Sequence, residues 1–156
     1  MKIDTETDQV VDELEVGIQP TSLVMDCNNK LWTVTDGGYE GSPYGHEAPS
    51  LYRIDAETFT IEKRFKFEFG DWPSEVQLNG TKDKIYWLND DVWEMDVTAE
   101  QVPAEPFLPY DNTLYYGLTI CPHTGDVYVA DAIDYVQQGM IYRYSKEREL
   151  IDKFYV

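Results

Sequence analysis

A seven-residue strand pattern occurs three times in this chain of 156 residues, and this repetition limits the possible folds more than any other feature. The copies are KLWTVTD at 30–36, KIYWLND at 84–90 and DVYVADA at 126–132. Each is rich in β-branched and aromatic residues and runs into Asn or Asp, which is typical of a strand that ends in a turn. Repetition on this scale predicts several copies of one supersecondary unit packed side by side.

Matching strands also flank each copy. TSLVMD, PSEVQL and YGLTIC precede the copies, and SLYRID at 50–55, DVWEMD at 91–96 and MIYRYS at 140–145 follow them. A fourth run comes last each time, as FTIEKRFKF, EQVPAEPFL and RELIDKFYV. Each repeat therefore predicts four antiparallel strands, and the sequence offers no convincing helix.

The distances between repeats favour a β-propeller. From Leu31 to Ile85 to Val127 the spacing is 54 and then 42 residues, which suits four-stranded blades with loops of variable length. The predicted fold class is all-β: a β-propeller fragment of three four-stranded antiparallel blades, at about 20–67, 73–108 and 114–156. Residues 1–156 then form a single partial propeller. Tyr52, Trp93 and Tyr142, at the third position of each third strand, are expected to pack between neighbouring blades.

The start of the chain falls within a repeat. IDTET at 3–7 matches IDAET at 54–58, so residues 2–16 are predicted to form a leading two-stranded hairpin from a preceding blade. Propellers close with about four to eight blades, and three and a half blades leave sheet faces uncovered. We expect either that the chain is part of a longer one or that copies self-associate through the exposed blade faces.

The net negative charge of the chain argues against two classes of binding partner. The chain has 12 Lys and Arg against 30 Asp and Glu, a formal net charge of −18, which disfavours nucleic acid and anionic membrane surfaces. No apolar run approaches the ~20 residues of a membrane span, and the first residues lack the apolar segment of a secretory signal. Cys27 and Cys121 fall in different blades, so we expect no disulfide between them.

Blade topology predicts where a ligand site lies. Loops that join second to third strands share one end of a propeller with the loops between blades, and here they are rich in aromatic residues. Aromatic rings supply contact area and their polar tips hydrogen-bond, which suits sugars, planar cofactors or proteins, although the same rings also pack loops together. The candidate ligand-binding residues are Tyr39, Tyr44, His46, Asp71, Trp72, Tyr110, Tyr115, Asp131 and Tyr135.

One of these loops, TDGGYEGSPYGHEAP at 35–49, is longer than a hairpin requires. The second repeat has no residue between Asp90 and Asp91 at the same place, so the additional 13 residues, 37–49, are not needed to reverse the chain. We expect a semi-ordered element at the rim of the channel. Its glycines are not a phosphate loop, because the Lys of G-x-x-x-x-G-K-[ST] is missing.

Several motifs together resemble a known family. KIDTETDQVVDELEVGIQPTSLVMD, LWTVTDGGYEGSPYG, LYRIDAETF and VYVADAIDYVQQGMIYRYS are similar to the C-terminal half of surface-layer proteins of the YVTN-repeat propeller family of gut bacteria. The resemblance covers essentially the whole chain. It implies a roughly seven-bladed propeller displayed outside the cytoplasm, at the cell surface or in the periplasm. It brings no catalytic residues, and some relatives look like capture proteins for corrinoids or other nutrients.

Catalysis has little support in the sequence. His46 and His123 are predicted at opposite ends of the blades, and no Ser or Cys lies in a G-x-S-x-G context. In lactonase-like propellers a channel-facing carboxylate and Asn or Asp residues at blade ends bind a divalent ion, and Glu75, Asn89 and Asp131 are a faint version of that arrangement. No EF-hand spacing is present. We predict no catalytic residue, no metal site and no cofactor.

The sequence therefore favours a non-catalytic binding or display propeller that contacts a small molecule, a glycan or an envelope protein through its loops. A metal-dependent lactonase-like hydrolase and a purely structural surface-layer component are the alternatives, because propellers serve all three purposes.

Overall fold

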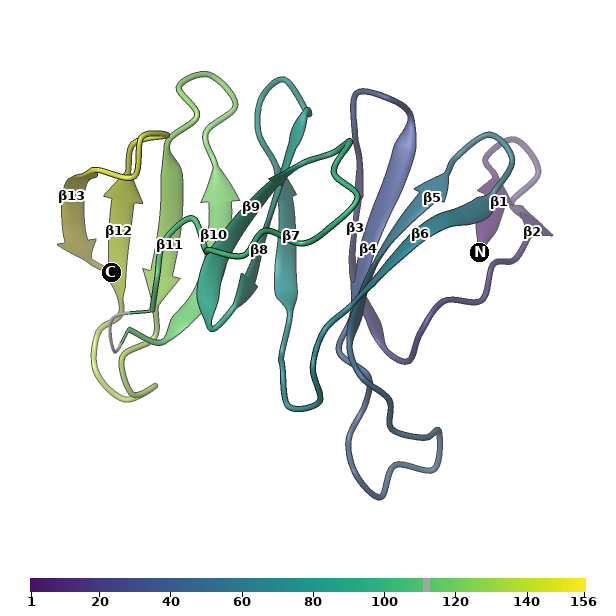
Figure 1. Ribbon diagram of the computed structural model, residues 1–156, viewed down its shortest axis with the longest axis horizontal. Coiled ribbons are helices and arrows are strands. Elements are labelled where there is room, and N and C mark those ends of the chain that lie inside the picture. Colours follow the sequence, from purple (N-terminus) through teal and green to yellow (C-terminus); the bar gives the residue numbers. More distant parts are fainter. Residues whose placement is uncertain (111–112) are drawn as a thin grey trace.

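The computed structural model describes residues 1–110 and 113–156, and within these ranges the chain forms strands and no helix. Four antiparallel sheets follow one another in sequence order and lie side by side (Figure 1). The first is the hairpin β1 (Lys2–Asp4) and β2 (Gln9–Asp12), closed by a turn at 5–8. The predicted all-β fold, a fragment of a β-propeller, is confirmed.

Two of the sheets have four strands in the order of the sequence. The first of them, which we call the first sheet, has β3 (Pro20–Met25), β4 (Lys30–Thr35), β5 (Ser50–Asp55) and β6 (Thr60–Lys66). The other, which we call the third sheet, has β10 (Tyr115–Ile120), β11 (Val127–Asp131), β12 (Met140–Tyr144) and β13 (Leu150–Tyr155). Each strand pairs with the next in the chain, as expected of a propeller blade.

The middle sheet differs from the prediction of four strands. It has β7 (Ser74–Leu78), β8 (Lys84–Asn89) and β9 (Asp91–Asp96), and the expected fourth strand at 100–108 is reduced to one bridge between Val92 and Leu108. Prolines explain the loss. Pro103 and Pro106 interrupt this segment, and since proline lacks an N–H and fixes φ it cannot continue a ladder.

The strand register agrees with the repeat alignment. Leu31, Ile85 and Val127 occupy equivalent positions of β4, β8 and β11. Each is paired with the fifth residue of the following strand, namely Ile54, Met95 and Tyr144. The residues that the repeats share therefore have the same neighbours in all three sheets.

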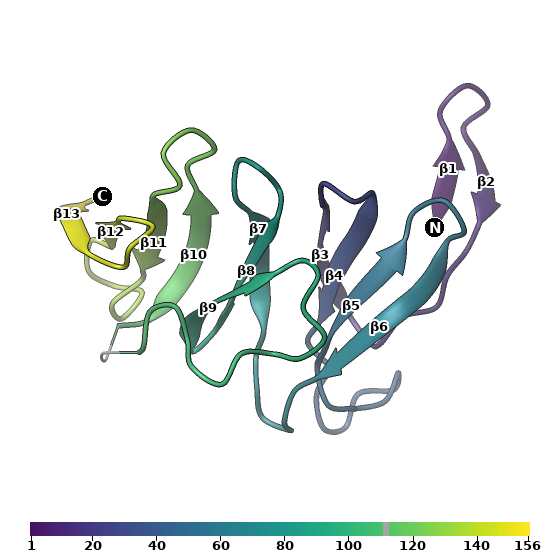
Figure 2. The ribbon, with the colours of Figure 1, turned by 45° about the horizontal axis from the view of Figure 1, so that its top comes forward.

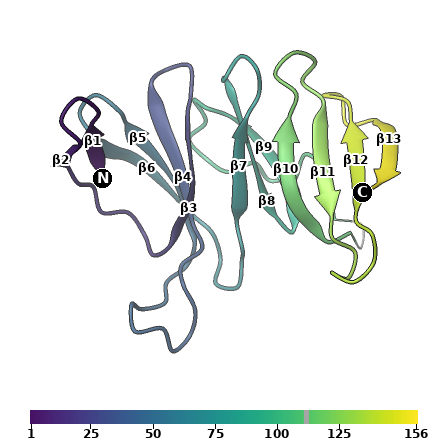
Figure 3. The same cartoon turned by 180° about the vertical axis from the view of Figure 1, so that it is seen from behind.

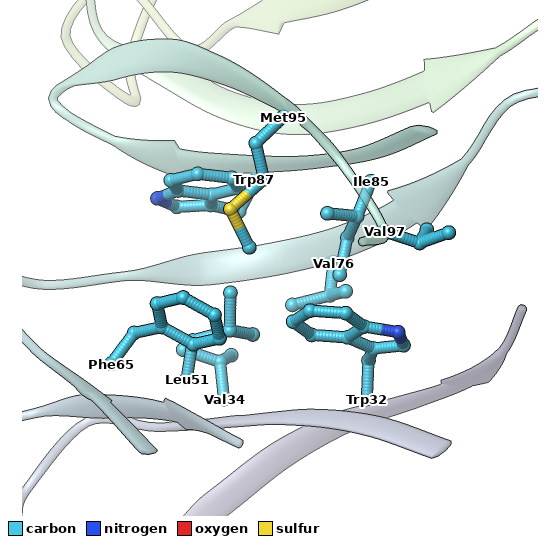
Figure 4. Packing of buried hydrophobic residues seen from close by; sticks show 9 residues of the cluster. All are labelled: Trp32, Val34, Leu51, Phe65, Val76, Ile85, Trp87, Met95 and Val97. Atoms are coloured by element: carbon cyan, nitrogen blue, oxygen red, sulfur yellow. The ribbon is translucent and has the colours of Figure 1, made fainter. Parts of the chain in front are cut away.

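Both faces of the middle sheet are buried, because successive residues of a strand point to opposite faces. Ile85 and Trp87 of β8 pack toward the first sheet, in a cluster with Trp32, Val34, Leu51, Phe65, Val76, Met95 and Val97 (Figure 4). Tyr86 and Leu88 pack toward the third sheet, in a cluster with Val92, Phe107, Leu108, Leu118, Ile120, Val127 and Val129. This explains why KIYWLN reads as an almost continuous apolar run.

The two ends of the sheets differ in their connections. Short turns at 26–29, 79–83 and 121–126 lie at one end, and the longer loops 36–49, 67–73 and 132–139 lie at the other (Figures 1 and 3). We call the second end the loop face. At the turn end, the N–H of Cys27 donates to the carbonyl of Lys82 at 3.0 Å, which joins the first and middle sheets. None of the described residues belongs to a helix that could cross a membrane.

Candidate functional site

The strands β3, β7 and β10 lie next to one another, and each has an irregularity where it meets the loop face. The register shifts between Pro20 and Ser22, between Ser74 and Gln77, and between Tyr115 and Gly117. A bulge of this kind turns the strand and interrupts the alternation of side chains. Consecutive residues at these strand ends can therefore face the same space.

These strand ends and the adjoining loops enclose a hollow of about 480 Å³, which we call the inter-sheet hollow. Residues from all three sheets line it. Its aromatic residues are Trp72, Tyr110, Tyr115, Tyr116 and Tyr135, and the others are Thr21, Asp36, Pro73, Ser74, Leu88, Asp90, Thr113 and Leu114. Trp72, Tyr110, Tyr115 and Tyr135 were predicted from the sequence as candidate site residues, and the structure brings these four together.

Trp72 is held by its backbone while its ring is exposed. Its N–H donates to Oδ1 of Asn89 at 3.0 Å, which fastens the loop 67–73 to the end of β8. Within the same loop, the Glu68 N–H donates to Oδ2 of Asp71 at 2.9 Å. The side chain of Trp72 is 64% exposed. The loop therefore exposes the indole from a backbone position that is tied to β8.

Tyr116 and Tyr135 contact each other in the lining of the hollow. Their rings meet edge to face, with centroids 5.7 Å apart and an interplanar angle of 87°. Sequence reasoning did not select Tyr116. In a regular strand Tyr115 and Tyr116 would point to opposite faces of β10. The bulge before Gly117 brings both to the hollow. Gly117 is a glycine inside a strand pattern, which is the sequence signal that could have indicated such a bulge.

Asp131 has a supporting role. It is 6% exposed and does not line the inter-sheet hollow. Its Oδ1 accepts hydrogen bonds from the N–H groups of Leu114 at 3.0 Å and Ile133 at 2.8 Å. One buried carboxylate thus fixes the two segments that carry Tyr115 and Tyr135. Between the candidate residues Tyr110 and Tyr115, residues 111 and 112 lie outside the described residues.

Tyr44 and His46 lie in another place. They line a second, wider hollow of about 690 Å³, which we call the rim hollow, together with Glu15, Val16, Gly17, Ile18, Gly45, Glu47, Tyr52, Ile61 and Arg64. The His46 ring meets the ring of Phe69 edge to face, with centroids 5.2 Å apart. Tyr39 and Asp71 line neither hollow. The candidate residues therefore share the loop face but do not form one site.

The long loop that carries Tyr44 is anchored at its base. The Glu47 carboxylate accepts hydrogen bonds from the Ile18 N–H at 2.9 Å and from Nη2 of Arg64 at 3.0 Å. The bond from Ile18 is the main reason that the pKa of Glu47 lies below its usual value, and Arg64 adds to the effect. Gly38 and His46 form a bridge across the loop. Beyond this bridge the tip extends away from the sheets (Figure 2).

Of the three residues considered for a metal, two already accept hydrogen bonds from backbone N–H groups. Asn89 accepts from Trp72, Asp131 accepts from backbone N–H groups, and Glu75 lines neither hollow. Glu75 has a φ of 54° within the irregular part of β7. In the described ranges, no three or more His, Cys, Asp and Glu residues are grouped as metal ligands. His123 lies in the turn 121–126, at the end opposite to His46.

Comparison with known proteins identifies the fold and no sequence family. No family model and no curated protein sequence matches the chain. Among solved structures, a quinonprotein alcohol dehydrogenase-like protein from Bacteroides thetaiotaomicron is similar with a TM-score of 0.65 and 15% identity over 85% of this chain and 32% of that one. A gluconolactonase from Xanthomonas campestris gives 0.60 and 11%, over 85% of this chain and 45% of that one.

A β-propeller domain from Myceliophteria thermophila is also similar, with a TM-score of 0.58 and 17% identity, over 86% of this chain and 40% of that one. The chain thus spans less than half the length of each of these structures. At these identities the likeness shows the fold alone.

Proposed function

We propose that this protein is a non-catalytic binding propeller whose inter-sheet hollow holds a ring-bearing molecule, such as a sugar of a glycan or a planar cofactor of the corrinoid type. One observation carries the proposal: five aromatic side chains, from strand β10 and from three connections at the loop face, line one hollow. Its volume of about 480 Å³ lies within the ~300–1,000 Å³ of small-molecule sites. Aromatic faces stack on rings, and tyrosine hydroxyls donate and accept hydrogen bonds at the edges.

The placement of Trp72 supports this function. Forming a binding surface costs less free energy when its parts are already ordered, and the loop of Trp72 is fastened to Asn89. Asp131 likewise orders the segments that carry Tyr115 and Tyr135, through its hydrogen bonds from Leu114 and Ile133. Display outside the cytoplasm, at the cell surface or in the periplasm, belongs to the same proposal and rests on the sequence resemblance. Fractionation of cells that express the protein tests that part.

The test uses the full chain with a panel of neutral glycans, amino sugars and corrinoids, followed by tryptophan fluorescence and thermal shift. A ligand bound in the hollow should quench the fluorescence of Trp72 and raise the melting temperature of the protein. Trp72→Ala should weaken its binding by roughly fivefold or more, since loss of a stacked ring is worth about 1–3 kcal/mol. The matched control is Tyr44→Ala, which removes an exposed aromatic residue from the rim hollow. Equal binding by both variants would contradict the site.

The alternative of a metal-dependent lactonase is tested with the same samples. A calcium-dependent thermal shift together with hydrolysis of a sugar lactone, both lost in Glu75→Gln, would favour the hydrolase over the binding protein. A structural surface-layer role, in contrast, predicts no saturable response to any small molecule of the panel.

A further inference from the structure

The ionisable side chains around the inter-sheet hollow, its tyrosines apart, are acidic. Its described lining residues include Asp36 and Asp90, and no Lys, Arg or His is among them. The chain as a whole is also negatively charged, with a formal net charge of −18. A cleft lined by one sign of charge concentrates ligands of the opposite sign and repels those of its own. The hollow is therefore poorly suited to a carboxylate or phosphate ligand.

Asp90 is the carboxylate whose charge is available to a ligand. It forms the one-residue connection between β8 and β9, with a φ of 55°, and it is exposed. In the part of the chain that the structure describes, no hydrogen bond or ion pair reaches its carboxylate. Neighbouring acids differ, because Oδ1 of Asp91 accepts from the Tyr110 N–H and Oδ1 of Asp36 accepts from the Gly38 N–H at 2.8 Å.

Among the described residues, no Lys or Arg group lies over an aromatic ring of the hollow. Elsewhere in the described chain, Lys or Arg groups lie over the rings of Phe59, Trp32, Phe65, Tyr52, Tyr128 and Phe107, at 5.2–5.9 Å from the centroids. None of these rings belongs to the hollow, whose aromatic residues include the exposed Trp72. A cation within about 6 Å of an aromatic face is attracted by the ring, and tryptophan is the strongest such partner.

We propose that the ligand of the inter-sheet hollow carries an ammonium group, primary or quaternary, on a ring-bearing body, as an amino sugar does. The ring stacks against Trp72 and the tyrosines, and the ammonium group lies toward Asp90. This inference rests on the proposed function, because it specifies the charge of the ligand that the hollow binds. It distinguishes amino sugars from neutral sugars and from anionic cofactors.

Three small probes of similar shape separate charge from ring stacking: benzyltrimethylammonium, benzyl alcohol and benzoate. Binding to the full chain is followed by fluorescence quenching and calorimetry at low salt. We expect benzyltrimethylammonium to bind roughly three- to tenfold more tightly than benzyl alcohol, and benzoate to bind most weakly. Added salt should weaken the binding of benzyltrimethylammonium and leave the binding of benzyl alcohol nearly unchanged.

Asp90→Asn tests the residue, with Asp8→Asn as its matched control. Both positions have a φ of 55°, a conformation that asparagine tolerates, and both variants change the net charge equally. Asp90→Asn should remove most of the preference for the cation over benzyl alcohol, whereas Asp8→Asn should retain it. Trp72→Ala should weaken the binding of both benzyltrimethylammonium and benzyl alcohol.

The outcomes separate this inference from the function on which it rests. If benzyl alcohol binds as tightly as the cation, the positive charge is wrong. If both Asp variants behave alike, the contact between the ammonium group and Asp90 is wrong. In either case the binding function stands. If no probe and no member of the wider ligand panel perturbs Trp72, the binding function fails and the inference fails with it.

Discussion

The N–H of Trp72 donates a hydrogen bond of 3.0 Å to the side-chain oxygen of Asn89, so the loop that presents the indole is fixed to the end of a central strand. The backbone carbonyl of Asn89 also accepts from Nε1 of Trp93 at 3.1 Å. One asparagine therefore connects an exposed tryptophan of the candidate site with a partly buried tryptophan of the core. Order in the loop depends on this connection.

Asn89→Ala should loosen the loop without changing the lining of the hollow. We expect a decrease of about 1 kcal/mol in the free energy of unfolding, the usual net value of one hydrogen bond, and weaker binding of any ring-bearing ligand. Urea denaturation and ligand titration measure the two effects. Asn28→Ala, at an exposed turn position, is the control. Unchanged affinity would show that the loop is ordered by other contacts.

Asp26→Ala should be much more damaging. The buried Asp26 carboxylate accepts from Nε1 of the fully buried Trp32 at 2.8 Å and from the N–H groups of Asn28 and Lys30. Its removal leaves a buried indole N–H without a partner, which costs about 2–4 kcal/mol together with the lost bonds to a charged group. Denaturant unfolding measures the loss. Glu13→Ala, in an exposed segment, should have almost no effect, and equal losses in both variants would contradict this account.

The sequence predicted the fold well because its repeats determine the register. Once KLWTVTD is aligned with KIYWLND, and SLYRID with DVWEMD, Leu31 and Ile85 hold equivalent positions, as do their partners Ile54 and Met95. The prediction of a fourth strand in the middle sheet was wrong. The segment EQVPAEPFL resembles the fourth strands of the other repeats only weakly, and Pro103 and Pro106 prevent it from pairing in a ladder.

The site was predicted only in part. Topology placed the aromatic loops at one end, but which of them share a hollow depends on backbone irregularities that the alternation of residues does not show. The bulge at Tyr115–Gly117 added Tyr116, and the tethering of Glu47 to Ile18 drew Tyr44 and His46 into the rim hollow.

Glu47 predicts a pH dependence of stability. Its pKa in the folded protein is lowered, so its contribution is present above the unfolded value of about 4.5 and is lost as the pH falls through the lower folded value. Glu47→Gln should therefore be less stable than the native protein at pH 7, and the difference should shrink below about pH 4.5. Urea midpoints across this range measure it. Glu57→Gln, at an exposed turn, should show no such trend.

Gly80→Ala tests the contact between the turns of the middle and third sheets. A Cβ at this position would lie 1.8 Å from the backbone carbonyl oxygen of Pro122. Because the position of a Cβ is fixed by its own backbone and the carbonyl cannot rotate away, the two turns would have to separate. We expect a loss of about 1–3 kcal/mol from overpacking. Gly117→Ala is the control, because its Cβ would meet Ala130 at an ordinary 3.5 Å. Similar stability of the two variants would mean that the turns move apart freely.

Self-association through exposed blade faces stays a prediction. The outer face of the first sheet exposes Leu23, at 63%, and borders an apolar hollow of about 370 Å³. Burial of this surface favours association, while the net charge of −18 opposes it, so we expect oligomers that increase with salt. Sedimentation at several concentrations, with Leu23→Glu against Val10→Glu in the hairpin, measures this. A monomer under all conditions would refute it.

The long loop has a practical consequence for protein engineering. It leaves and re-enters the first sheet through Thr35 and Ser50, which are paired and fully buried, so the register is set before the loop begins. Near its tip, a Cβ at Gly41 would meet no atom within 4 Å. A foreign peptide inserted directly after Gly41, which itself has a φ of 87° and is best kept, would therefore extend into solvent without disturbing the sheet. This makes the chain a scaffold for displaying chosen sequences at its loop face.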